Sequence, residues 1–222
     1  MKFRCDGLEL SEAISVVSKA ISNKTTSQIL EGIKMVAKDD VLILSATDLE
    51  MSIEKTIRAE VENDGETVVP GRLFGEYIKK LTNEQIECEL NEKNQLRIAY
   101  TDSEGVLQCM EISEFPSIRE LDKDSYFEIE KEDFKKLIGD VFYAVAQDDS
   151  RPILKGILIE TNLNNIRAVA LDGCRLSISN KMLVSSTNDF KLIIPEKNMY
   201  EIVKMMDSEG SIKVYVHSNN IM

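Results

Sequence analysis

The stretch "VALDGCRLSIS", from Val169 to Ser179, has the outline of two strands that meet at a turn around Asp172-Gly173. Apolar residues alternate with smaller ones on both sides of the turn, which is typical of strands in a half-buried sheet. A second stretch, "LSATDLEMSIE" at Leu44 to Glu54, has the same outline, and its Asp48 precedes Asp172 by 124 residues. The two stretches indicate that the chain repeats itself.

The offset of 124 residues relates many other positions in the two halves. It pairs Phe3 with Phe127, Ile14 with Ile138, and Gly32 with Gly156. After one inserted residue, "VVPGRLFGEYIKKL" (68–81) matches "LIIPEKNMYEIVKMM" (192–206). This long match predicts two copies of one domain, at residues 1–120 and 121–222. The second copy ends before a counterpart of residues 98–118, so we expect it to be incomplete at its C-terminal end.

Hydrophobic periodicity predicts helices over 8–21, 71–81, 130–146 and 196–207, each with one apolar face. Short alternating segments between them, separated by Asn, Asp and Gly, predict strands joined by tight turns. The predicted order in each copy is strand, helix, four strands, helix, then a hairpin and a further strand. This order indicates an α+β unit in which two helices lie on one face of antiparallel sheet.

The composition indicates a folded protein without a membrane segment. Of its 222 residues 43% are hydrophobic and 30% are charged, and no apolar run approaches the roughly 18 residues of a spanning helix. The N-terminus lacks the apolar core of a signal peptide, so a cytoplasmic location is expected. The four cysteines have no CxxC spacing, which favours free thiols over two disulfide bridges.

The distribution of charge is more informative than the formal net charge of −12, which argues against a general nucleic-acid binder. The four predicted helices hold nine basic and ten acidic residues, so most of the negative excess belongs to strands and loops. Ordinary solvated helix faces explain this pattern as well as a functional surface does.

Motifs for catalysis and metal binding are absent from the sequence. His217 is the only histidine, and no GxGxxG, Walker A, HExxH or GxSxG motif occurs. The carboxylates at 122–124 and 147–150 are expected to belong to solvated turns rather than to a cation site. We therefore predict no catalytic residue, no metal and no cofactor. A carboxylate-based metal enzyme stays open as a hypothesis that requires paired acids in one pocket.

The ordered motifs resemble the bacterial DNA polymerase III beta subunit family, the sliding clamps. The resemblance covers the whole chain and rests on "ILEGI" (29–33), "ATDLEMSI" (46–53), "VVPGRLF" (68–74), "DSRPILKGI" (149–157), "DGCRL" (172–176) and "SNNI" (218–221). It implies tandem clamp domains, of which this chain would hold the first and most of the second, while the third is absent from it. In this family two subunits close head to tail into a ring around duplex DNA, with helices lining the hole.

The resemblance also implies which residues face DNA. Matching basic or polar positions are Lys24, Arg72, Gln147, Arg151 and Lys197. A ring retains DNA by its closed topology, so it needs only a weak positive potential inside, and near-neutral helices within an acidic protein agree with this requirement.

The turn quoted first has a second implied role, because only one copy carries Gly-Cys-Arg-Leu. An aspartate recurs at this position in both copies, as Asp48 and Asp172, so Asp172 is expected to be a structural residue that bonds to backbone N–H groups of the turn. In clamps this segment forms part of a cleft for partner peptides. The corresponding residues here are Leu154, Leu171, Gly173, Cys174, Arg175 and Leu176. Gly173 would leave room for a peptide, Leu154 and Leu176 would line an apolar pocket, and Arg175 would donate at its rim.

The partners implied by the resemblance are duplex DNA, the DNA polymerase III alpha subunit, the clamp loader, and other polymerases and repair proteins that bind through short peptides. A head-to-tail homodimer is expected of the full-length protein, without membrane or catalytic chemistry. The alternative is a truncated protein-only scaffold that has lost ring closure. Leu171 and Cys174 replace the Thr and His common in relatives, which predicts a shifted peptide preference.

Overall fold

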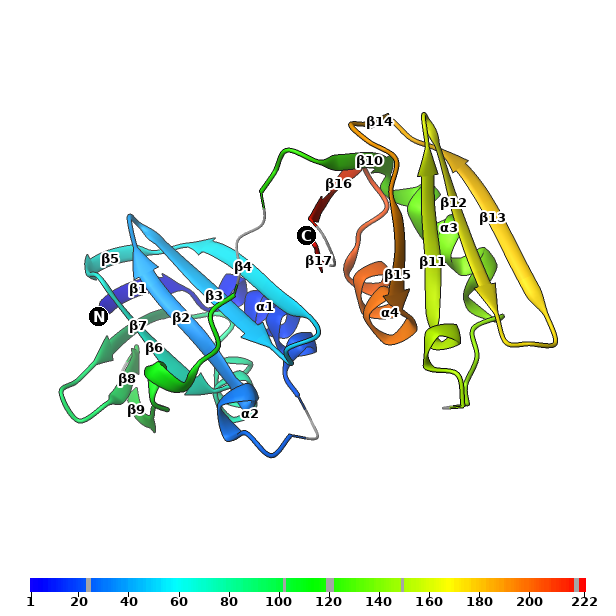
Figure 1. Ribbon diagram of the computed structural model, residues 1–222. Coiled ribbons are helices and arrows are strands. Elements are labelled where there is room, and N and C mark those ends of the chain that lie inside the picture. Colours follow the sequence, from blue (N-terminus) through cyan, green and yellow to red (C-terminus); the bar gives the residue numbers. More distant parts are fainter. Residues whose placement is uncertain (23–24, 102, 119–121, 149, 218–219) are drawn as a thin grey trace. The chain divides into compact units, whose positions relative to one another are not determined.

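A computed structural model describes residues 1–22, 25–101, 103–118, 122–148, 150–217 and 220–222. The chain divides into two compact units, Met1–Ile118 and Arg119–Met222, which we call unit 1 and unit 2. Each unit has its own antiparallel sheets (Figure 1). Each also has its own hydrophobic core. The fold is therefore α+β with antiparallel sheets, as the sequence predicts.

Unit 1 contains two sheets and two α-helices. One sheet has the strand order β5-β1-β7-β8-β9 and the other β4-β3-β2-β6. The elements are β1 (Lys2–Asp6), α1 (Gly7–Val17), β2 (Gly32–Lys38), β3 (Val41–Thr47), β4 (Ser52–Arg58), β5 (Glu60–Asn63), β6 (Gly65–Pro70), α2 (Gly71–Ile78), β7 (Gln85–Leu90), β8 (Gln95–Tyr100) and β9 (Ser103–Gln108), with 3₁₀ turns at Ser18–Ala20, Gln28–Glu31 and Ile112–Glu114.

Unit 2 repeats this order with a smaller second sheet. Its sheets have the orders β13-β12-β11-β15 and β14-β10-β16-β17. The elements are β10 (Tyr126–Glu130), α3 (Lys131–Phe142), the 3₁₀ helix η4 (Pro152–Lys155), β11 (Gly156–Asn162), β12 (Asn165–Leu171), β13 (Leu176–Met182), β14 (Ser185–Ser186), β15 (Lys191–Pro195), α4 (Glu196–Met205), β16 (Ser211–His217) and β17 (Asn220–Ile221).

The helices are one-sided, as their periodicity predicts. Leu10, Ile14 and Val17 of α1 are buried, and α3 repeats the pattern with Phe134 and Ile138. These faces pack on the sheets and form the cores of the two units. Helix packing against one face of a sheet leaves the other face of the helix and of the sheet exposed to solvent.

The helix ends and the number of strands differ from the prediction. Helix α1 ends at Val17 and not at residue 21, α2 ends at Ile78 and not at residue 81, and α4 ends at Met205 and not at residue 207. Helix α3 ends at Phe142 and not at residue 146, because Ala144 and Val145 donate to carbonyls only three residues back and tighten the chain into turns. Five strands and not four lie between the helices of each unit, with β5 as the additional strand in unit 1 and β14 in unit 2. In unit 1 the additional strand arises where the chain leaves one sheet after β4 and enters the other as β5, with a break at Ala59.

Helix α4 is less covered than its counterpart α2. Ile78 of α2 is completely buried, whereas Val203, at the matching position, is half-buried, as are Ile202 and Met206. The described second sheet of unit 2 has only the short strand β17 at the position that β8 occupies in unit 1. Less sheet is therefore available to cover the apolar face of α4.

Candidate functional site

The turn between β12 and β13 is held by the side chain of Asp172. Its Oδ1 accepts hydrogen bonds from the backbone N–H groups of Cys174 at 2.9 Å and Arg175 at 3.0 Å. Asp48 does the same in unit 1, where it accepts from Glu50 at 3.1 Å and Met51 at 2.8 Å. The prediction that Asp172 bonds to backbone N–H groups of its turn is confirmed, and the structure shows the same arrangement at Asp48.

Both turns also contain a residue in the left-handed region of backbone conformation. In unit 1 this residue is Leu49, with φ of 75°, and in unit 2 it is Gly173, with φ of +93°. Glycine adopts this conformation without the steric cost that a side chain adds. Gly173 therefore has a backbone reason to be glycine that is independent of any bound peptide.

The side chain of Arg175 makes two contacts, one with Asp172 and one with Tyr143. Its Nε donates to Oδ2 of Asp172 at 2.7 Å, and its guanidinium carbon lies 5.8 Å from the centre of the Tyr143 ring. The backbone N–H groups of Cys174 and Arg175, and then the Arg175 side chain, lower the pKa of Asp172 below its ordinary value. Because the folded state lowers this pKa, Asp172 stabilises the turn at neutral pH, and the stabilisation is lost as pH falls through the lowered pKa.

The structure brings most of the predicted cleft residues into this turn. Leu171 and Leu176 are cross-strand partners at the ends of β12 and β13, and both are exposed. Gly173, Cys174 and Arg175 lie between them and are exposed as well. Leu154 belongs to η4, which directly precedes β11 at the end of the sheet where β12 finishes. It is half-buried, and its carbonyl accepts from the N–H of Ala146 at 3.1 Å.

The predicted DNA-facing residues lie at helix ends and beside η4. Arg72 is in the first turn of α2 with 92% of its side chain exposed, and its Nε lies 3.1 Å from Oε1 of Glu76. Lys197 is in the first turn of α4, Gln147 follows α3, and Arg151 directly precedes η4. All of these side chains are exposed. Lys24 lies outside the described residues.

The exposed faces of α4 and α1 differ in charge. The near-equal numbers of basic and acidic residues in the four helices together do not show this difference. The face of α4 that is exposed carries Lys197, Tyr200 and Lys204, with the Lys204 amine 5.6 Å from the centre of the Tyr200 ring. The exposed face of α1 instead carries Glu9 and Glu12. The fully exposed charged residues of α4 are thus basic, although Glu196 and Glu201 of the same helix are half-exposed, whereas those of α1 are acidic.

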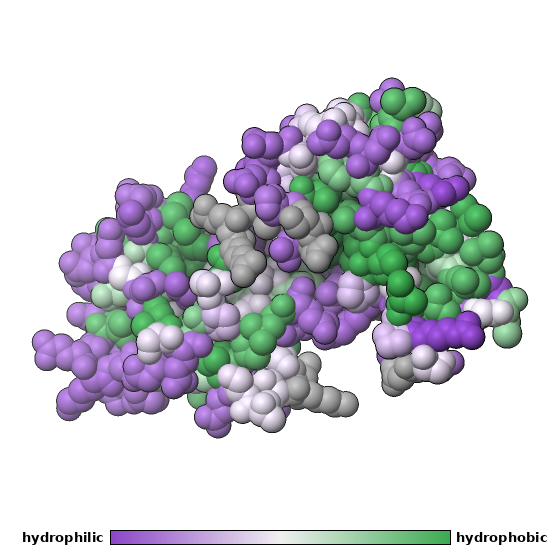
Figure 2. Space-filling view, in the orientation of Figure 1, coloured by the Kyte–Doolittle hydropathy of each residue, from purple (hydrophilic) through white to green (hydrophobic). Residues whose placement is uncertain are grey.

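The solvent face of the sheet β13-β12-β11-β15 has an apolar row that unit 1 lacks. Ile193, Leu158, Val169 and Ile178 are consecutive cross-strand neighbours on it. Hydrophobic side chains gather over these strands in Figure 2. The matching row in unit 1 reads Val68, Lys34, Ser45 and Glu54, which is mostly polar.

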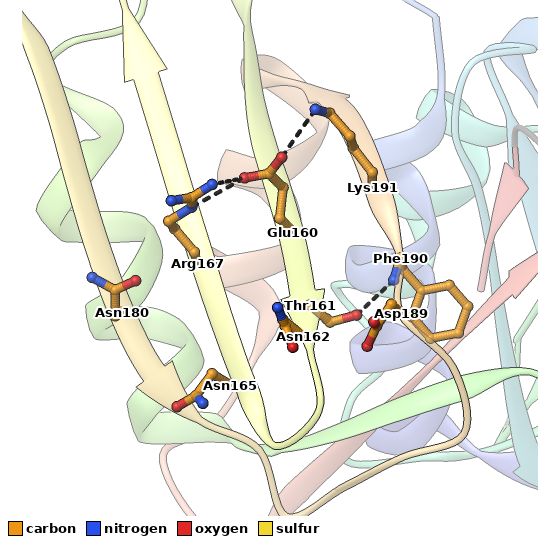
Figure 3. A pocket seen from close by; sticks show the side chains of 9 residues that line it. All are labelled: Glu160, Thr161, Asn162, Asn165, Arg167, Asn180, Asp189, Phe190 and Lys191. Carbon is orange, nitrogen blue, oxygen red and sulfur yellow. Dashed lines mark hydrogen bonds and ion pairs between the residues drawn. The ribbon is translucent and has the colours of Figure 1, made fainter.

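The next row on the same face is ionic. Glu160 accepts from Nε of Arg167 at 3.0 Å and pairs with the Lys191 amine at 3.0 Å, and these bonds lower the pKa of Glu160 (Figure 3). A polar pocket of about 600 Å³ opens here, lined also by Asn162, Asn165 and Asp189. Because Asn162 and Asn165 pair at the end of the sheet opposite to Leu171 and Leu176, this pocket is separate from the predicted cleft.

Neither a metal centre nor a membrane span occurs in the part of the chain that the structure describes. No group of three or more His, Cys, Asp or Glu side chains is arranged there to hold a metal ion. No helix within the same ranges has the length and apolar character that crossing a membrane requires. Cys5, Cys88 and Cys109 are buried free thiols, and Cys174 is exposed. Burial raises the pKa of Cys5 to about 12.

Known families match both units in tandem. The N-terminal domain of the DNA polymerase III beta subunit matches residues 1–119, and the central domain of the same subunit matches residues 128–222. The chain belongs to the DNA polymerase III beta subunit family. The resemblance that the sequence motifs carry is thereby confirmed.

Curated relatives in the family bear the name beta sliding clamp. Those from Staphylococcus epidermidis and Staphylococcus aureus are 32% identical over 213 residues, which is 92% of this chain and 56% of the relative's length. The chain thus spans about half the length of these clamps. Their name describes a clamp rather than a catalyst, in agreement with the prediction of a non-catalytic subunit.

Solved clamp structures have the same fold. The DNA polymerase sliding clamp of Bacillus subtilis has a TM-score of 0.95 at 27% identity, covering 100% of this chain and 61% of its own. A sliding clamp of Pseudomonas aeruginosa bound to griselimycin has a TM-score of 0.91 at 25% identity, with the same coverage. The α+β clamp fold of the chain is therefore established.

The sequence reasoning missed two residues beside the turn. Tyr143 lies against Arg175, and Asp140 accepts hydrogen bonds from Ser177 and Ser179 of β13. The two serines occupy inward positions of β13, where unit 1 has Ile53 and Lys55. Hydroxyl groups at inward positions require a polar partner, so their spacing could have predicted an acceptor on the facing helix.

Proposed function

We propose that residues 1–120 and 121–222 are the first two domains of a three-domain clamp subunit. Two such subunits would close head to tail around duplex DNA and tether the polymerase III alpha subunit. The tandem match of the N-terminal and central domain families to the two units supports this proposal most directly. The clamp would work in the cytoplasm, without chemistry of its own.

The proposed DNA contact rests on basic side chains at helix starts. Arg72 and Lys197 are exposed in the first turns of α2 and α4, and Lys204 follows on the exposed face of α4. Side chains of this kind reach phosphate oxygens and carry no base preference. Arg72 has a weak exposed ion pair with Glu76, which phosphate can replace at little cost. Few such contacts suit a clamp that must slide.

Retention on DNA tests the ring. The product of the natural gene would be assembled by a clamp loader on nicked circular plasmid and followed by gel filtration. A closed ring stays on the circle and is lost after the plasmid is linearised. Equal loss from circular and linear DNA would contradict the ring.

Variants test the assigned residues separately from ring closure. The double variant Arg72→Ala/Lys197→Ala should weaken binding to short duplex DNA at low salt and reduce the salt slope by about one per lost phosphate contact. Lys38→Ala, at the exposed end of β2, is the matched control and should bind as the natural chain does. An unchanged slope in the double variant would remove these two residues from the DNA interface.

We also propose that the turn residues Leu171, Gly173, Cys174, Arg175 and Leu176, with Leu154, form one wall of a cleft for partner peptides. The clamp loader, polymerases and repair proteins would dock there. The support is chemical, because exposed Leu171 and Leu176 flank a turn that offers a guanidinium group. Leu171 is expected to favour a more apolar peptide than a Thr would.

Griselimycin, which the Pseudomonas aeruginosa clamp binds, is the probe that we choose, on the proposal that it occupies this cleft. Its binding should slow alkylation of Cys174, the exposed cysteine, and should weaken in Leu176→Ala. Arg167→Ala, in the polar pocket at the opposite end of the sheet, is the control and should bind normally. Full alkylation of Cys174 in the presence of saturating griselimycin would contradict the assignment.

The net charge of −12 favours a second candidate, a protein-only scaffold without ring closure. It would bind partner peptides in the same cleft but would not distinguish circular from linear DNA. The retention experiment therefore separates the two functions, because only the clamp predicts a difference between the two DNA forms.

A further inference from the structure

Tyr143 directly follows α3, and the guanidinium carbon of Arg175 lies over its ring. The guanidinium carbon lies 5.8 Å from the ring centre, and 60% of Tyr143 is exposed. A guanidinium over an aromatic face is attracted by the ring quadrupole. Tyr143 is thus largely exposed, and burial contributes little to holding its ring in place. Its contact with Arg175 has a defined geometry.

Two further bonds fasten the same end of α3 to the strand that follows the turn. Ser177 Oγ donates to the carbonyl of Asp140 at 2.8 Å, and Ser179 Oγ donates to Oδ2 of Asp140 at 2.8 Å. The end of α3 and the start of β13 therefore have a fixed separation. Tyr143, one residue beyond α3, is consequently held at a constant place beside the turn.

Unit 1 has none of these groups at the matching positions. The repeat pairs Tyr143 with Lys19, Arg175 with Met51, and Asp140 with Val16. Met51 is buried, so the unit 1 turn directs that side chain inward. The exposed arginine and the aromatic ring beneath it therefore occur together, in the unit whose turn is proposed to bind peptides.

We propose that Tyr143 is a positioning residue for partner recognition, which it serves by holding Arg175 at the rim of the cleft. This inference rests on the proposed function of the turn. Asp172 accepts a hydrogen bond from Nε of Arg175, and the guanidinium carbon lies over the ring of Tyr143. These two contacts restrict the Arg175 side chain to few rotamers, so its terminal NH₂ groups have a nearly fixed position at the rim of the cleft. A partner that binds a preset arginine loses less side-chain entropy than one that must order it.

Two variants separate the role of the ring face from that of side-chain size. Tyr143→Phe keeps an aromatic face, whereas Tyr143→Leu keeps an apolar side chain and loses the quadrupole. Because the position is exposed, both variants are expected to fold. Lys19→Leu, at the matching position of unit 1, is the control for a new leucine at this place in the repeat.

The first readout is the NMR spectrum of the 222-residue chain. The Hε and Hδ protons of Arg175 should show an upfield ring-current shift in the natural chain, in Tyr143→Phe and in Lys19→Leu. The shift should be lost in Tyr143→Leu. A shift that persists in Tyr143→Leu would show that the ring does not hold Arg175 and would overturn the proposal.

The second readout is the affinity for griselimycin. An exposed cation–π contact is worth a factor of about two to five in affinity, so Tyr143→Leu should weaken binding by that factor and Tyr143→Phe should restore it. Equal affinity in Tyr143→Leu, or failure of Tyr143→Phe to restore binding, would overturn the positioning role. This readout uses the full-length product of the natural gene. If that protein without a substitution fails to bind griselimycin, the proposed cleft is refuted instead, which distinguishes the two failures.

Discussion

At the scale of single residues, the two turns share one hydrogen-bond pattern but differ in backbone strain. Asp48 and Asp172 each bond to two backbone N–H groups, and the next residue takes a left-handed conformation. Unit 1 adopts it with Leu49 and unit 2 with Gly173. The left-handed conformation costs roughly 1–2 kcal/mol for a residue with a side chain, so unit 1 retains strain that unit 2 has removed.

We expect Gly173→Ala to lower the free energy of unfolding of unit 2 by about 1 kcal/mol, because alanine meets the left-handed penalty at φ of +93°. Nothing lies within 4 Å of the added Cβ, so no clash contributes. Urea unfolding should show a lower midpoint with an unchanged m value. Leu49→Gly is the control and should not lower stability, since Leu49 is 69% exposed. A Gly173→Ala variant as stable as the natural chain would contradict the account.

At the scale of elements, two helices each contain an internal glycine, Gly75 in α2 and Gly139 in α3. The surroundings of these two glycines differ in the packed structure. An alanine Cβ at Gly139 of α3 would meet nothing within 4 Å, whereas at Gly75 of α2 it would lie 3.2 Å from Cγ2 of Ile14. Gly75 therefore permits the close approach of α1 and α2. Gly139 has no such role among the described residues.

Gly139→Ala should stabilise unit 2 by about 0.5–1 kcal/mol, because alanine loses less backbone entropy in a helix. Gly75→Ala should gain less or lose stability, because Ile14 must shift to admit the methyl group. Chemical unfolding of the two variants measures the difference. Equal gains at both positions would contradict the proposed packing role of Gly75.

At the scale of the whole molecule, each unit has a core of its own. Ile14 and Ile138 are repeat partners, and each is only 2% exposed in its own core. The core of unit 1 also receives Leu96 and Ile98 from β8, for which unit 2 has only β17. We therefore expect unit 2 to be the less stable of the two.

Ile14→Ala and Ile138→Ala should each cost about 2–5 kcal/mol, confined to the unit that carries the substitution. Hydrogen exchange of backbone amides, read separately in the two units, measures this effect. Unit 2 should exchange faster in the 222-residue chain without a substitution. If either substitution accelerated exchange equally in both units, the two cores would form one cooperative structure and the expectation would be wrong.

The sequence alone determined the features that depend on local chemistry. The repeat, the α+β class, the apolar helix faces and the aspartate turns follow from periodicity and turn residues, which act over a few positions. Family membership followed from motifs in a fixed order, and the family matches confirm it. The assigned DNA and peptide residues remain predictions.

Only the tertiary structure decided which side chains meet across long sequence separations. Asp140 contacts Ser177 and Ser179, and Tyr143 contacts Arg175, although more than thirty residues separate the partners. Tertiary structure also shows that α1 exposes glutamates and α4 lysines, which the near-equal totals of charge conceal. The physical reason is that periodicity defines which face of a helix is apolar, whereas the packing of that face on the sheet determines what the opposite face and the helix ends contact.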